Sequence, residues 1–192
     1  GICTDTNREL IDVFTETHRS VLSTALLAWW ESHGRSGIPW KQLPGGVCPA
    51  ADHELDPYGI WIAEVMLQQT QLVVVLPYWT RWMVAFPTLE ALAAASLDEV
   101  RFQWQGLGYY ARARRLYEAA QLLVGGPWPR TLKEWMALPG IGRTTAGSIL
   151  SSAFNSRLPI LDGNVKRVLA RLMAHPSPPA RDEAMFWCLS EA

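Results

Sequence analysis

Hydrophobic residues along this chain recur with a helical period, and strand-like alternation is almost absent. No Asn-Gly or Asp-Gly pair joins two β-branched runs into a hairpin. Proline or glycine marks nearly every junction between the apolar segments, as is typical of many short helices. The pattern predicts an all-α protein with helices over residues 18–32, 59–76, 78–85, 88–94, 97–103, 109–124, 131–137, 143–153, 163–174 and 180–191.

The amino-acid composition indicates that the protein is globular. The chain has 192 residues, 49% of them hydrophobic and ten of them tryptophan, so it can bury a sizeable core and general disorder is excluded. Its most apolar N-terminal stretch, 21–30, is shorter than the roughly 20 residues that span a bilayer and has no signal-peptide cleavage site. We therefore expect an intracellular protein without membrane contact. Three cysteines lie far apart without a C-x-x-C pair, so no metal site is predicted within these residues: Cys3, Cys48 and Cys188.

Charge is distributed unevenly along the chain. The formal net charge of −1 gives no indication of nucleic-acid binding, but residues 1–60 carry a net −4 and residues 61–192 a net +3. Local basic patches matter more to a phosphate ligand than the total charge does. The basic residues form two clusters that we expect to face such a ligand: Arg112, Arg114 and Arg115, and then Lys166, Arg167 and Arg171.

The predicted helix over 59–76 is apolar on most of its circumference, which indicates burial. Glu64, Gln68 and Gln71 follow the i, i+4, i+7 spacing and would form one polar stripe on it. Burial would raise the pKa of the Glu64 carboxyl, so that it could hold a proton near neutral pH as a general acid does. The alternative is that the stripe is simply the solvent face of the helix.

Two further segments have features of ligand sites. The run Leu138-Pro-Gly-Ile-Gly-Arg143 lies between two predicted helices; its glycines allow a tight turn that presents helix N-terminal amides to a phosphate, although a plain helix connection would also contain glycine. Asp162 stands where an N-cap belongs, and a plain cap would explain it. A carboxylate held ionised at that position, paired with a protonated one, is also the arrangement that breaks glycosidic bonds.

Several runs, in this order along residues 20–190, resemble the adenine DNA glycosylase (MutY) family of the helix-hairpin-helix (HhH-GPD) glycosylase superfamily. They are Ile38-Pro-Trp40, Trp61-Ile-Ala-Glu-Val-Met-Leu-Gln-Gln-Thr-Gln71, Gly106-Leu-Gly-Tyr-Tyr-Ala-Arg-Ala-Arg114, Leu138-Pro-Gly-Ile-Gly-Arg-Thr-Thr-Ala-Gly147 and Leu161-Asp-Gly-Asn-Val-Lys-Arg-Val-Leu-Ala-Arg171.

The resemblance implies an enzyme of base excision repair, a monofunctional glycosylase that hydrolyses the N-glycosidic bond of adenine mispaired with 8-oxoguanine or guanine. Glu64 would protonate the adenine and Asp162 would stabilise the oxocarbenium-like sugar, with Asn164 and Thr144 supporting them through hydrogen bonds. Gln69 and Tyr109 would enter the base stack as the base is flipped out. The remaining DNA contacts would come from Gln68, Leu138, Gly140, Gly142, Arg143 and Lys166.

The resemblance also implies two helical lobes with a DNA-binding cleft between them. A six-helix lobe over 50–157 would contain the hairpin and Glu64, and residues 1–49 with 158–192 would form the lobe of Asp162. The family's [4Fe–4S] cluster would have its cysteine ligands beyond Ala192, so we expect the isolated residues to be a weakly active fragment. We expect a monomer bound to double-stranded DNA, in a bacterial cytoplasm or nucleoid or in a eukaryotic nucleus or mitochondrion.

Two other functions compete with this one. An endonuclease III-like bifunctional glycosylase and lyase acts on oxidised pyrimidines through a lysine in the helix after the hairpin, where this chain has Thr144. A non-catalytic helix-hairpin-helix DNA-binding module would use the hairpin alone, and would need neither Glu64 on an apolar helix nor Asp162 at a helix start.

Overall fold

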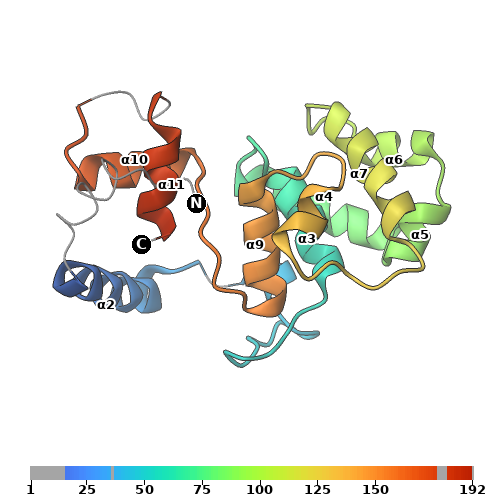
Figure 1. The fold of residues 1–192 in the computed structure, drawn as a ribbon. Helices are drawn as coiled ribbons and strands as arrows, with labels where there is room; N and C mark the ends of the chain where they lie inside the picture. Colours follow the sequence, from blue (N-terminus) through green and yellow to red (C-terminus); the bar gives the residue numbers. More distant parts are fainter. Residues whose placement is uncertain (1–15, 36, 177–180, 192) are drawn as a thin grey trace. The chain divides into compact units, whose positions relative to one another are not determined.

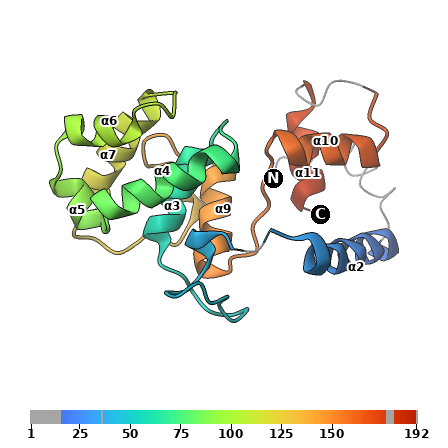
Figure 2. The same ribbon diagram turned by 180° about the vertical axis from the view of Figure 1, so that it is seen from behind.

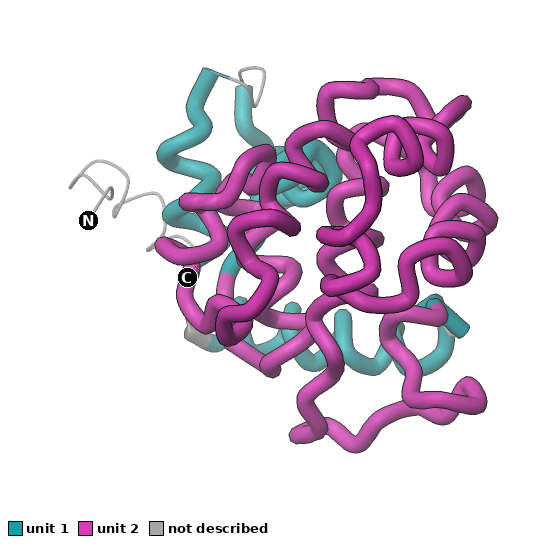
Figure 3. Tube along the Cα trace, turned by 90° about the vertical axis from the view of Figure 1, so that its right-hand side faces the viewer, with its two compact units in different colours: residues 1–38, 159–192 teal, residues 39–158 magenta. Residues whose placement is uncertain are grey.

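The computed structural model describes residues 16–35, 37–176 and 181–191. The chain forms two compact units, residues 1–38 with 159–192 (unit 1) and residues 39–158 (unit 2), coloured separately in Figure 3. Within the described residues the regular structure is helical, apart from one isolated bridge between Leu43 and Val47. The all-α prediction is therefore confirmed. In the described part of the chain, no helix is both long enough and apolar enough to cross a membrane.

Unit 2 contains a short 3₁₀ helix and seven α-helices, as many as the apolar pattern predicts between residues 59 and 153, whereas the resemblance implied a lobe of six (Figure 1). Residues 39–49 belong to this unit, whereas the resemblance implied that they belong to the other lobe. Trp40 is the reason, since it is buried and its ring lies 5.4 Å from that of Trp79. The elements are η1 (Pro39–Lys41), α3 (Pro57–Leu67), α4 (Leu72–Ala85), α5 (Leu89–Ala94), α6 (Leu97–Trp104), α7 (Ala111–Leu123), α8 (Leu132–Met136) and α9 (Arg143–Phe154).

Helix α3 is the centre of unit 2. It begins where Asp56 accepts a hydrogen bond from the Tyr58 amide and Pro57 occupies the first turn, both favourable at a helix N-terminus. Its residues from Pro57 to Ala63 are all buried, and the helix packs against α4, α7 and α9, which Figure 2 shows from behind. The predicted burial of this segment is confirmed. Burial of one large apolar side chain contributes about 1.5–3 kcal/mol, so α3 anchors the unit.

The predicted helix over 59–76 is wrong in one respect, because it is broken at residues 68–71. Helix α3 ends before Gln68, and α4 begins after Gln71 and continues through Pro77. An interior proline removes one helical hydrogen bond, but burial of Val75 and Trp82 on either side of it holds α4 together. The left-handed backbone of Gln69, at φ 58°, makes the actual break.

Unit 1 contains α2 (Glu16–His33), α10 (Gly163–Leu172) and α11 (Glu183–Glu191). Its described core consists of Leu161, Met185 and Phe186, with Val165 and Leu169 among the half-buried residues packed against it. This packing fixes the start of α10, the segment that carries the predicted carboxylate.

Candidate functional site

The C-terminal end of α3 is tied directly to the hairpin. Glu64 lies in the last two turns of α3 and is half-buried, although its neighbours on both sides are fully buried. Gln68 follows one turn later, and its side-chain amide donates to the Gly140 carbonyl at 3.1 Å and to Thr145 Oγ1 at 3.2 Å. The predicted stripe is wrong for Gln71, which is the N-cap of α4 and not part of α3. Gln68 thus joins the C-terminal end of α3 to the hairpin, and its role in DNA binding stays a prediction.

The predicted hairpin is a tight turn between α8 and α9. Gly140 has φ +79°, a conformation that glycine adopts readily, and it lies against the Arg115 side chain, so that an added Cβ would lie 3.2 Å from Arg115 Cβ. Ile141 is buried, and its amide donates to the Leu138 carbonyl at 3.3 Å. The turn is therefore anchored from within by its own hydrogen bond and its buried isoleucine.

Gly142 is the N-cap of α9, and the space beside it is open. Gly142 itself has no side chain to make a capping hydrogen bond, and an added Cβ there would meet nothing within 4 Å. Arg143 and Thr144 are half-buried in the first turn. The first amides of a helix have no intrahelical acceptor, and the helix dipole places partial positive charge there. This is the geometry of an anion site.

The two predicted wedge residues lie in exposed, left-handed turns. Gln69 has φ 58° between α3 and α4, and Tyr109 has φ 49° just before α7. The Tyr109 side chain is 62% exposed although it is a large aromatic group. Non-glycine residues in this backbone region are uncommon and concentrate at functional sites. Both side chains are thus held out of the core by turns that the fold maintains.

Arg112 corrects the prediction of a surface arginine cluster. Arg112 is buried, and its Nη1 donates to three backbone carbonyls at the end of α3. Burial lowers the pKa of Arg112, but an arginine remains protonated at neutral pH. The sequence did carry a signal: Arg112 follows the same helical spacing as the buried residues Leu116, Ala119 and Leu123.

The other two arginines of the cluster, Arg114 and Arg115, remain at the surface, and Arg114 forms an ion pair with Glu118 at 3.6 Å.

In unit 1, Asp162 caps α10 as predicted. Its carboxylate is exposed and accepts a hydrogen bond from the Val165 amide at 2.8 Å. Asn164 Oδ1 accepts from Arg167 at 2.8 Å, and Lys166 forms an ion pair with Glu183 at 3.0 Å. Both side chains were predicted to serve the site, Asn164 by supporting a carboxylate and Lys166 by binding DNA. All of these contacts lie within unit 1.

In the part of the chain that the structure describes, no cluster of metal-ligating side chains is present. Cys48 is exposed, Cys188 is buried in α11, and the described residues contain no group of three or more histidine, cysteine or acidic side chains that could hold a metal ion.

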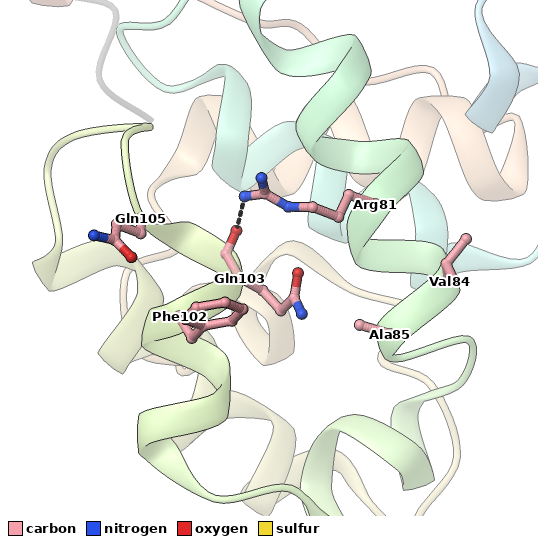
Figure 4. Close-up of a pocket in the computed structure, with 6 residues that line it drawn as sticks. All are labelled: Arg81, Val84, Ala85, Phe102, Gln103 and Gln105. Carbon is pink, nitrogen blue, oxygen red and sulfur yellow. Dashed lines mark hydrogen bonds between the residues drawn. The ribbon is translucent and has the colours of Figure 1, made fainter.

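A pocket of about 370 Å³ lies between α4 and α6, apart from the predicted residues (Figure 4). Arg81 crosses it to donate to the Gln103 carbonyl at 2.6 Å. Phe102 and Val84 form its exposed apolar rim. None of the predicted catalytic or DNA-binding residues lines this pocket.

The chain is similar in sequence to adenine DNA glycosylases. It is 46% identical over 158 residues to that of Mus musculus, 45% over 164 residues to that of Homo sapiens, and 42% over 154 residues to that of Buchnera aphidicola subsp. Baizongia pistaciae. These matches cover 80%, 81% and 79% of this chain. They span only 30%, 29% and 41% of the respective relatives.

The fold is similar to solved structures of DNA glycosylases. A thermostable thymine-DNA glycosylase superposes with a TM-score of 0.76 at 25% identity, covering 93% of this chain and 79% of that one. A trapped endonuclease III–DNA covalent intermediate superposes with a TM-score of 0.62 at 26% identity, covering 73% and 69%. The family model of the HhH-GPD superfamily base excision DNA repair protein matches residues 62–189. This chain, with its α8–α9 hairpin and its buried α3, belongs to the HhH-GPD superfamily of base excision DNA repair proteins.

Proposed function

We propose that this chain carries out adenine excision from DNA, hydrolysing the N-glycosidic bond of an adenine opposite 8-oxoguanine or guanine. The observation that carries the proposal is the link between α3 and the hairpin. Glu64 lies one turn before Gln68, and Gln68 bonds to Gly140 in the phosphate-binding turn. The Glu64 carboxyl on α3 is therefore held at a fixed position relative to the hairpin that is proposed to bind the DNA backbone. The similarity to adenine DNA glycosylases supports adenine as the base.

In the proposed reaction, the Glu64 carboxyl donates its proton to the adenine ring, and the bond between C1′ and N9 breaks. The bonding electron pair leaves with the base, so the sugar becomes oxocarbenium-like. The Asp162 carboxylate stabilises that positive charge, and Asn164 and Thr144 hold the two carboxyl groups in place. Water then adds to C1′ and gives its proton to the Glu64 carboxylate, leaving free adenine and an abasic site.

DNA is proposed to be held by its backbone. The N-terminal amides of α9, beside Gly142 and Arg143, would bind phosphate, giving position without sequence specificity. Gln69 and Tyr109 would fill or wedge the base stack, since an enzyme that acts on a base must take it out of the duplex. The protein is proposed to act as a monomer on double-stranded DNA.

The bifunctional alternative requires a nucleophilic amine. At position 144, in the first turn of α9, the chain has a threonine, which cannot form an imine. Lys166 is near Asp162 in sequence, but its ammonium group is paired with Glu183. These observations favour a monofunctional glycosylase over a glycosylase with lyase activity.

The test is a single-turnover assay with excess protein on a duplex containing one 8-oxoguanine:adenine pair. We expect adenine release, strand cleavage only after alkali or heat, and no protein–DNA adduct on borohydride reduction. Direct cleavage with a trapped adduct formed at the same rate would favour the bifunctional enzyme. Tight binding without base release would favour the non-catalytic module, and either result would overturn the proposal.

A further inference from the structure

Arg112 satisfies the C-terminal end of α3. The last carbonyls of a helix have no intrahelical donor, and here Arg112 Nη1 reaches those of Val65, Met66 and Gln68 at 3.0, 2.8 and 2.6 Å. A hydrogen bond that involves a charged group is about twice as strong as a neutral one. The guanidinium therefore fixes where α3 stops and where the Gln69 turn begins.

The second nitrogen of the same guanidinium joins two turns that are far apart in the sequence. Arg112 Nη2 donates to Thr70 Oγ1 at 3.2 Å and to the Gly108 carbonyl at 3.3 Å. Thr70 directly follows Gln69, and Gly108 directly precedes Tyr109. The contacts of one side chain thus flank both left-handed residues.

Aromatic rings complete the surroundings of Arg112. The guanidinium carbon lies 5.2 Å from the ring centroid of Tyr109 and 5.2 Å from that of Trp104. Trp104 Nε1 also donates to the Gly108 carbonyl, at 2.9 Å. The Tyr109 ring is therefore anchored on its cationic neighbour while most of its surface stays exposed.

We infer that Arg112 is a positioning residue that holds Gln69 and Tyr109 at a fixed spacing, so that both side chains enter the base stack in one step. The inference rests on the proposed function, in which these two residues act as wedges. Because Arg112 is buried, its proposed role is to act through these two side chains and not through contact with DNA. Lysine cannot replace it, because one ammonium nitrogen cannot reach both the α3 carbonyls and the pair formed by Thr70 and Gly108.

The experiment follows base unstacking directly. Stopped-flow fluorescence is recorded on a duplex with 2-aminopurine in place of the target adenine opposite 8-oxoguanine, and affinity is measured for a duplex with an abasic analogue at that position. We expect Arg112→Lys to slow the fluorescence rise about tenfold or more. Affinity for the abasic duplex, which needs no unstacking, should stay within about threefold of wild type.

Three variants make the test specific. Thr70→Val preserves shape and removes one acceptor of Nη2, so a smaller slowing is expected in a protein whose core is untouched. Arg101→Lys, an exposed exchange at an arginine paired with Asp98, should leave both measurements unchanged. In a Gln69→Ala/Tyr109→Ala background, Arg112→Lys should add less than about a twofold effect, because the side chains it positions are gone.

Each contrary result has a distinct meaning. A normal fluorescence rise in both Arg112→Lys and Thr70→Val overturns the inference while the proposed function stands. A loss of affinity for the abasic duplex as large as the slowing of the fluorescence rise, with full additivity in the double-alanine background, assigns Arg112 a purely structural role and also overturns the inference. If wild-type protein gives no fluorescence rise and releases no adenine, the proposed function fails and the inference fails with it.

Discussion

The open space beside Gly142 makes a sharp prediction about DNA binding. Gly142 has φ −92° and ψ 173°, which alanine adopts without strain, and an added methyl group meets nothing within 4 Å. Alanine is a poorer N-cap than glycine by roughly 0.5 kcal/mol, partly offset by the lower entropy of the unfolded chain. The variant Gly142→Ala should therefore melt within about 3 °C of wild type.

DNA affinity should respond much more strongly than stability. In the proposed complex the new methyl group lies where a phosphate approaches the α9 amides, and a hydrogen bond to a charged group contributes about 1.5–3 kcal/mol. Loss of one such bond raises Kd about 10- to 150-fold. Because backbone contacts carry no sequence information, the loss should be the same for matched and mismatched duplexes in a fluorescence anisotropy titration at fixed salt.

Gly140→Ala is the matched control for this prediction. The same methyl group there meets Arg115 Cβ at 3.2 Å on a backbone with φ +79°, which disfavours alanine by about 1–2 kcal/mol. That variant should lose stability and affinity together. If Gly142→Ala binds within about twofold of wild type at unchanged melting temperature, phosphate does not approach this helix N-terminus and the reasoning is refuted.

Two further predictions concern carboxylates. Asp162→Asn keeps a good N-cap for the Val165 amide, so the melting temperature should stay unchanged. Single-turnover adenine release should fall about 100-fold or more, because the anion facing the sugar is lost. An unchanged rate would remove Asp162 from the mechanism. Hydrogen bonds from Thr131 and its neighbours lower the pKa of Glu134 below the ordinary 4.5, so its stabilising contribution is present above pH 4.5 and is lost as the pH falls through its folded-state pKa. The melting temperature of Glu134→Gln should therefore lie below that of wild type at pH 7, and thermal melts should show the gap closing as the pH falls below 4.5. A gap that widens on acidification would contradict this explanation.

Local signals in the sequence predicted much of the fold. Proline, glycine and the helical period identified the helical class, and the Asp162 cap fixed the start of α10 within a residue of the observed helix. The burial of α3 followed from its apolar circumference. These features depend on residues close together in the chain, so they can be predicted from the sequence alone.

The break between α3 and α4 depends on distant residues. Within the run from Trp61 to Leu76 the apolar period continues without a glycine or proline, so the sequence predicts one helix. The helix stops at the left-handed residue Gln69, and Arg112, more than forty residues away, donates to the carbonyls at its end. The same contact explains why Arg112 was wrongly expected at the surface: its burial becomes favourable only when α7 packs against α3.

In the proposed mechanism, Glu64 is the acid that makes adenine a leaving group. Its most direct test compares wild type with Glu64→Gln, which preserves size and removes the proton donor, by single-turnover adenine release and by affinity for the same 8-oxoguanine:adenine duplex. We expect release to fall about 100- to 10,000-fold while Kd stays within about threefold. Release at the wild-type rate by a folded, DNA-binding Glu64→Gln protein would contradict it.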